Sequence, residues 1–165
     1  MLANHPSSAF TTTPLRLGSP EYVVRNSGDS RENGVFAARA FDRSSLVAKI
    51  FGSIVHERSL HTLQIGDGIH LYDPEFTGLF LHSCAPNVRV DMQRFEVHAV
   101  LDIESGEPLC MDYSSTEDVL HRQFPCLCGS RACRGWITGY REPINQEGVR
   151  YLQSRMAKAP LRGVV

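Results

Sequence analysis

Short stretches of alternating apolar and polar residues, separated by turn residues, make up most of this chain. Glu21–Arg25 is one such stretch and runs into an Asn-Ser-Gly-Asp turn. Gly34–Ala40 and Leu46–Phe51 flank the polar run Asp42–Ser45 and are predicted to pair with each other. Alternation with a period of two residues is typical of strands that bury one face.

Two further pairs of segments predict β-hairpins. Leu63–Ile65 and Ile69–Tyr72 are joined by a Gly-Asp-Gly tripeptide, which favours a tight hairpin turn. Asn87–Val90 and Phe95–Val100 alternate on either side of a turn at Met92–Arg94. The chain is therefore predicted to contain several short antiparallel strand pairs.

Helical patterns are rare. Pro108–Tyr113 is predicted as a strand after the turn at Ser105-Gly106, and Ser114–Arg122 follows it as a helix with Ser115 at the N-cap position. Glu147–Lys158 has apolar residues three and four positions apart, which predicts a second helix. The pattern as a whole predicts a mainly β domain with few short helices and a loop-rich C-terminal third.

Length and composition fit one compact domain. The chain has 165 residues, 42% of them hydrophobic and 21% charged, with a formal net charge of −1. A protein that grips nucleic acid through its phosphates normally carries a basic excess, so no nucleic-acid partner is expected. No apolar run reaches the roughly 18–20 residues that span a bilayer, so no membrane partner is expected. The predicted partner is a protein tail or a small molecule, and the composition says nothing about oligomeric state.

The N-terminal stretch Met1–Thr13 lacks the basic-then-apolar layout of a secretory signal. Its Ser, Thr and Pro residues are typical of a flexible tail. The sequence thus predicts an intracellular protein and favours neither cytoplasm nor nucleus. In that setting the five cysteines are interpreted as thiols or metal ligands, not as disulfides.

Three cysteines form a metal-ligand pattern. Cys126, Cys128 and Cys133 make a C-x-C-x4-C cluster with a glycine, spaced so that several thiolates can converge on one ion. Structural zinc takes four ligands, so a fourth must come from elsewhere, and Cys84 is the candidate. The alternative is that these are unconnected thiols or a redox pair. Cys110, in an apolar strand, is interpreted as an ordinary buried thiol.

Several motifs occur together and in a fixed order. They are His82–Asn87 (HSCAPN), Ile103–Tyr113 (IESGEPLCMDY) and Cys126–Gly135 (CLCGSRACRG). In order and approximate spacing they resemble a SET-domain lysine methyltransferase with its post-SET tail. GVFAARAF resembles the first core strand of that family, and SSTE after Tyr113 resembles a run in short microbial and fungal SET proteins. The resemblance covers roughly Tyr22 to Gly139.

The resemblance implies a fold of small curved β-sheets around a pseudoknot, in which the segment carrying Asp112–Tyr113 crosses the segment near His82–Asn87. It also implies that Cys84 joins the three tail cysteines on a structural zinc ion. The implied division of the chain is a flexible tail at 1–18, a SET domain at 19–123, a post-SET zinc segment at 124–140 and a C-terminal helix or tail at 141–165.

The activity implied by the resemblance is methyl transfer from S-adenosylmethionine to a lysine side chain of a protein. Tyr113 matches the tyrosine whose hydroxyl lies by the methyl group and the amine. Met111 falls where family members place Phe or Tyr in the substrate channel, so it offers no hydroxyl to limit repeated methylation. The residues expected to bind the donor are Asn33, Gly34, Leu81, His82 and Leu127.

Two residues depart from the family's donor-binding pattern. Glu32 stands where the family has the first glycine of Gly-x-Gly, placing an anionic side chain near the donor's carboxylate. Leu81 stands where the family has an Asn that hydrogen-bonds the donor. An unmet polar group on the ligand costs about 1–3 kcal/mol, or roughly 5–150-fold in affinity.

These departures keep two alternatives open. One is a SET-fold enzyme that has lost methyl transfer and acts on a small molecule in a biosynthetic pathway; it predicts an apolar ligand and no donor binding. The other is a non-catalytic module that holds a peptide in the substrate groove, with binding indifferent to Tyr113.

Overall fold

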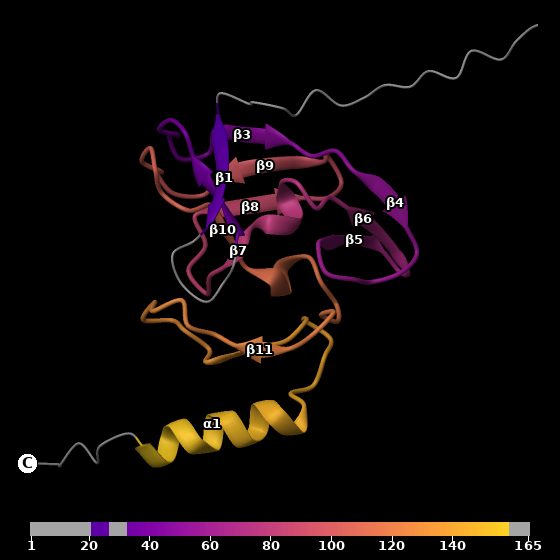
Figure 1. Ribbon diagram of the computed structural model, residues 1–165, viewed down its shortest axis with the longest axis vertical. Helices are drawn as coiled ribbons and strands as arrows, with labels where there is room; N and C mark the ends of the chain where they lie inside the picture. The colour runs from indigo at the N-terminus through magenta and orange to yellow at the C-terminus, as the bar shows by residue number, and fades with distance from the viewer. Residues whose placement is uncertain (1–20, 27–32, 159–165) are drawn as a thin grey trace, which may run out of the picture.

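The computed structural model describes residues 21–26 and 33–158 and is mainly β (Figure 1). The predicted tail at 1–18 and Glu32 lie outside the described residues. The strands are β1 (Tyr22–Asn26), β2 (Asn33–Ala37), β3 (Leu46–Lys49), β4 (Ser53–Val55), β5 (Thr62–Gly66), β6 (Ile69–Tyr72), β7 (Leu81–His82), β8 (Val88–Asp91), β9 (Glu96–Ala99), β10 (Cys110–Met111), β11 (Phe124–Pro125) and β12 (Trp136–Ile137). Two 3₁₀ turns, η1 (Thr77–Leu79) and η2 (Tyr113–Ser115), and one helix, α1 (Gln146–Lys158), accompany them. The predicted fold class is confirmed.

The strands form five small sheets in the described part of the chain. β5 pairs with β6, and β8 pairs with β9, both antiparallel, so both predicted hairpins are confirmed. Gly68 adopts a φ of +64° in the first hairpin turn, a conformation that glycine tolerates without strain. β4 and β3 add third strands to these two sheets.

The predicted pairing of Gly34–Ala40 with Leu46–Phe51 is wrong. β2 pairs with β1, and β3 pairs with β9. The free edge of β2 is taken by the segment before β10, because the backbone N–H of Leu109 donates to the carbonyl of Val35 at 2.8 Å. Alternation indicated that these segments were strands, but it does not encode which strands are neighbours.

Two segments far apart in the sequence meet at the centre of the molecule. β7 and β10 pair in parallel, with Leu81 opposite Cys110 and Met111 opposite His82. The side chain of Asn87 secures the crossing: its Nδ2 donates to the Pro108 carbonyl at 2.8 Å, and its Oδ1 accepts from the Cys110 N–H at 2.8 Å. This arrangement brings the HSC loop beside the strand that leads to Tyr113.

The predicted helix at Ser114–Arg122 is wrong, since only η2 forms there. The backbone groups of the segment that follows η2 bond to other parts of the chain. The Asp118 N–H donates to Oε1 of Gln64 at 2.8 Å, and the Leu120 N–H donates to Oε2 of Glu142 at 3.1 Å. Tertiary partners therefore take the hydrogen bonds that a helix would make within itself.

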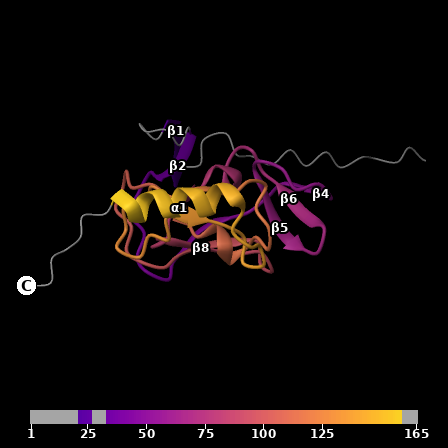
Figure 2. The ribbon, with the colours of Figure 1, turned by 90° about the horizontal axis from the view of Figure 1, so that it is seen from below.

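The C-terminal third lies beside the main β body (Figure 1) and ends in α1, which confirms the predicted second helix. Figure 2 shows α1 lying across the underside of the molecule. Trp136 anchors this part of the chain: it is buried, its Nε1 donates to Oε1 of Gln123 at 2.9 Å, and its ring lies 5.5 Å from that of Tyr151 on α1. No helix among the described residues is long and apolar enough to cross a bilayer.

Candidate active site

A cavity of about 570 Å³ opens between the β4–β5 loop and the segment leading into the cysteine-rich tail. Of the residues predicted to act in catalysis or binding, five line it: Leu81, His82, Met111, Tyr113 and Leu127. Asn33 and Gly34 do not line this cavity. The structure thus brings most of the predicted site together, and the role of each residue stays a prediction.

Tyr113 is held in one orientation. Its hydroxyl donates a hydrogen bond to the backbone carbonyl of Phe80 at 2.6 Å. Its ring meets those of His82 and Phe124 edge to face, with centroids 5.2 and 5.8 Å away. Because the hydroxyl proton is donated to this carbonyl, the lone pairs of the oxygen are directed away from it.

His82 is neutral and connects Tyr113 to a cysteine. Burial lowers the pKa of His82 to about 4, although the nearby Asp112 carboxylate opposes this shift. Its Nδ1 accepts from the backbone N–H of Tyr113 at 3.4 Å, so Nε2 carries the ring proton and faces Sγ of Cys84 at 3.4 Å. The histidine therefore has a structural hydrogen-bonding role in addition to lining the cavity.

Leu81 occupies the space beside Gly34. Leu81 is 4% exposed, and a Cβ atom on Gly34 would lie 3.0 Å from its Cγ and Cδ1. Glycine at position 34 therefore makes room for the leucine. Leu81 lines the cavity and Gly34 does not, so this contact connects the two parts of the predicted donor pocket.

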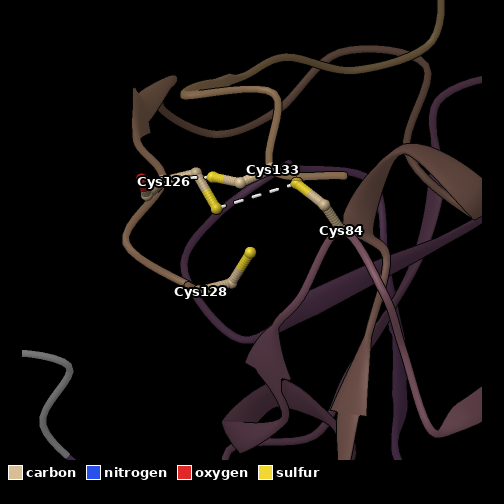
Figure 3. Close-up of side chains that lie close together, drawn as sticks. All are labelled: Cys84, Cys126, Cys128 and Cys133. Atoms are coloured by element: carbon tan, nitrogen blue, oxygen red, sulfur yellow. Dashed lines mark hydrogen bonds between the residues drawn. The ribbon is translucent and has the colours of Figure 1, made fainter. Parts of the chain in front are cut away.

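The four cysteines predicted as metal ligands converge. The sulfurs of Cys84, Cys126, Cys128 and Cys133 all lie within 4.8 Å of one another, and Figure 3 shows them facing a common space. The sulfurs of Cys84 and Cys126 are 3.7 Å apart. Tetrahedral metal–sulfur bonds of about 2.3 Å put sulfurs about 3.8 Å apart, so this set fits such an ion. Cys110 is buried in β10 and is not in the cluster.

The protonation of the cluster also fits a cation. Burial raises the pKa of the Cys126 thiol far above its usual range. Burial acts in the same direction on Cys128, but hydrogen bonds from Ser130 and its neighbours outweigh it and lower that pKa to about 5. Thiols this close cannot all ionise unless a positive charge lies among them. The cluster can therefore hold a metal ion.

Sequence reasoning missed the residue that ties the cysteine cluster to Tyr113. The backbone N–H of Arg134 points to Sγ of Cys84 at 3.4 Å, and its Nη2 pairs with Oδ1 of Asp112 at 2.5 Å. Its Nη1 donates to Oγ of Ser114 at 3.2 Å. The only signal in the sequence was the position of Arg134 directly after a metal-ligand cysteine.

Sequence reasoning also missed Glu117, which lines the cavity and is 7% exposed. Burial raises the pKa of Glu117, although a hydrogen bond from the Gln64 N–H and the nearby Arg58 oppose the shift. A carboxyl in an amphipathic pattern is normally assigned to the solvated face of a helix. Nothing in the sequence pattern indicated that this one is buried.

Comparison with known proteins identifies relatives of this chain. The SET domain family model matches residues 32–114, which is about half of the chain. Methyltransferase flvH of Aspergillus flavus is 32% identical over 106 residues, covering 62% of this chain and 60% of flvH. The H3 lysine-4 specific histone-lysine N-methyltransferase of Schizosaccharomyces pombe is 30% identical over 128 residues, covering 63% of this chain and 14% of that enzyme.

Solved structures agree on the fold. KRYPTONITE in complex with mCHG DNA and SAH has a TM-score of 0.57 at 22% identity, over 68% of this chain and 28% of that one. The methyltransferase domain of human SETMAR has a TM-score of 0.53 at 18% identity, over 72% and 58% respectively. The chain thus spans less than two thirds of the length of these relatives and structural neighbours. The family match, the shared fold and the arrangement around Tyr113 together lead to one conclusion: this chain belongs to the SET-domain family.

Proposed function

We propose that this protein is a SET-type methyltransferase that uses S-adenosylmethionine to methylate a lysine side chain of a protein. The observation that carries the proposal is the orientation of Tyr113, whose hydroxyl is fixed on the Phe80 carbonyl at 2.6 Å beside a cavity. The name of the Schizosaccharomyces pombe relative, which specifies H3 lysine-4, supports lysine as the acceptor.

When bound, S-adenosylmethionine supplies a methyl group activated by a positive sulfonium. Tyr113 suits such a neighbour because its oxygen presents a lone pair, while its proton is held by Phe80. Neutral His82 adds no positive charge next to the donor. Met111 is 3% exposed and has no hydroxyl, so it leaves the amine free of a hydrogen bond on that side.

The cysteine cluster is proposed to hold structural zinc. Four thiol ligands leave no coordination position open for a reaction, which is the usual form of a structural site. Residues of the same segment line the cavity, among them Cys126, Leu127 and Cys128. Metal binding would thus fix this wall of the cavity, and Leu127, which is 67% exposed, is the side chain proposed to cover the donor's adenine.

The experiment that tests the function is calorimetric titration of S-adenosylmethionine and S-adenosylhomocysteine into zinc-loaded protein, followed by a methylation assay on lysine peptides. Tyr113→Phe is the control, and it is expected to keep donor binding and lose turnover. Absence of binding to a folded, metal-replete sample would refute methyl transfer. Because Leu81 departs from the donor-binding pattern, that result would favour the SET-fold enzyme acting on a small molecule.

A further inference from the structure

The cavity that contains Tyr113 has a rim and an interior with different charge. Leu60, His121 and Arg122 line it and are exposed, whereas Met111 and Glu117 line it and are 3% and 7% exposed. The exposed residues form the rim, which an approaching partner contacts first. The buried residues form the interior, which contacts only a side chain that enters the cavity.

The rim offers no carboxylate. Among the described residues that line the cavity, Glu117 is the single Asp or Glu, and it is buried with Oε1 accepting from the Gln64 N–H at 2.9 Å. The adjacent Asp118 does not line the cavity, and its Oδ1 is paired with Nη2 of Arg58 at 2.6 Å. A basic peptide would find no exposed carboxylate among the described residues that line the cavity.

The rim does carry basic side chains from two segments of the chain. Arg122 and His121 come from the segment before β11, and Arg58 and His61 come from the β4–β5 loop, where Arg58 is already paired with Asp118. Arg122 is exposed and makes no ion pair or hydrogen bond with any residue that the structure describes. Its guanidinium is therefore free to bind an anionic group, and guanidinium geometry matches carboxylates.

We propose that the cavity selects a lysine flanked by acidic residues, with the lysine directed to Tyr113 and Glu117 and the acidic side chains meeting Arg122. Glu117 lies in the interior and offers its carboxyl oxygens to a hydrogen bond from the entering amine, whereas the rim disfavours a basic tail. This proposal rests on the proposed function, because it assumes that lysine enters at Tyr113. Exposed ion pairs alter affinity by about 1.5–5-fold each, so replacing acidic flanks by basic ones should weaken binding about tenfold.

The test measures peptide binding separately from turnover. Fluorescence anisotropy with the full, zinc-loaded chain and saturating S-adenosylhomocysteine compares three peptides that share a central lysine and differ in having Glu, Ser or Arg on both sides. Binding should decrease in that order at 50 mM salt, and the differences should shrink at 500 mM, where charges are screened. Arg122→Glu should reverse the order. Arg43→Glu makes the same charge change at an exposed position that does not line the cavity, and should leave the order unchanged.

The outcomes separate the two proposals. Equal binding of the three peptides, tighter binding of the Arg-flanked peptide, no binding of any peptide, or the same reversal with Arg43→Glu would overturn the acidic-substrate proposal. If the Glu-flanked peptide binds best but no peptide is methylated, the charge selection is supported and the methyltransferase function fails.

Discussion

Replacing Leu81 by Asn restores the residue that the family pattern places in the donor pocket, and the structure lets the cost be worked out. Leu81 is 4% exposed and packs against Gly34. Losing a buried leucine costs about 1.5–3 kcal/mol, and burying an unpartnered amide costs about 1–3 kcal/mol more. The free protein should therefore lose about 2.5–6 kcal/mol of stability, which a domain in the middle of the usual range of about 5–15 kcal/mol survives.

The donor should repay part of this loss. An amide that hydrogen-bonds the donor contributes about 1–3 kcal/mol, so Leu81→Asn should tighten binding roughly 5–150-fold. Calorimetry with S-adenosylhomocysteine measures the affinity, and urea unfolding with and without the ligand measures the stability. Leu81→Ala is the matched control, because it removes the packing without adding an amide. If the Asn variant is folded and binds no tighter than the Ala variant, position 81 does not contact the donor.

Three other changes test neighbouring features of the site. Arg134→Ala should destabilise the protein by about 1 kcal/mol, because it removes a partly exposed ion pair with Asp112. A double-mutant cycle with Asp112→Asn, measured by urea unfolding, should show a coupling energy of about 0.5–1 kcal/mol. A coupling energy of zero would exclude a stabilising interaction between the two side chains. Burial raises the pKa of Glu117, so ionising this carboxyl costs stability as the pH rises. Glu117→Gln keeps an acceptor for the Gln64 N–H, and it should be more stable than wild type at neutral pH and no different below about pH 4. A gain in stability of equal size at both pH values would contradict this. Chelation should expose four reactive thiols to a thiol reagent, and identical thiol counts with and without chelator would argue against a bound metal.

The sequence alone determined the order of motifs and the chemistry of the cysteines. Cys126, Cys128 and Cys133 are close in the chain, so their convergence needs only a short loop, and the ligand number of zinc directed attention to Cys84. The two hairpins were equally readable, because turn and alternation are local properties. A local pattern also identified α1, because apolar residues three and four positions apart are a property of the segment itself.

Tertiary structure decided what depends on partners far along the chain. The partner of β2 is β1 because its other edge is occupied by the segment around Leu109, and no local pattern encodes that choice. The segment after Tyr113 carries a helical pattern yet forms no helix, since Gln64 and Glu142 take its backbone hydrogen bonds. Glu117 belongs to the same segment and is buried with its Oε1 accepting from the Gln64 N–H. Helix propensity describes what a segment tends to form in isolation. In the segment after Tyr113, hydrogen bonds to distant residues and burial outweighed that tendency.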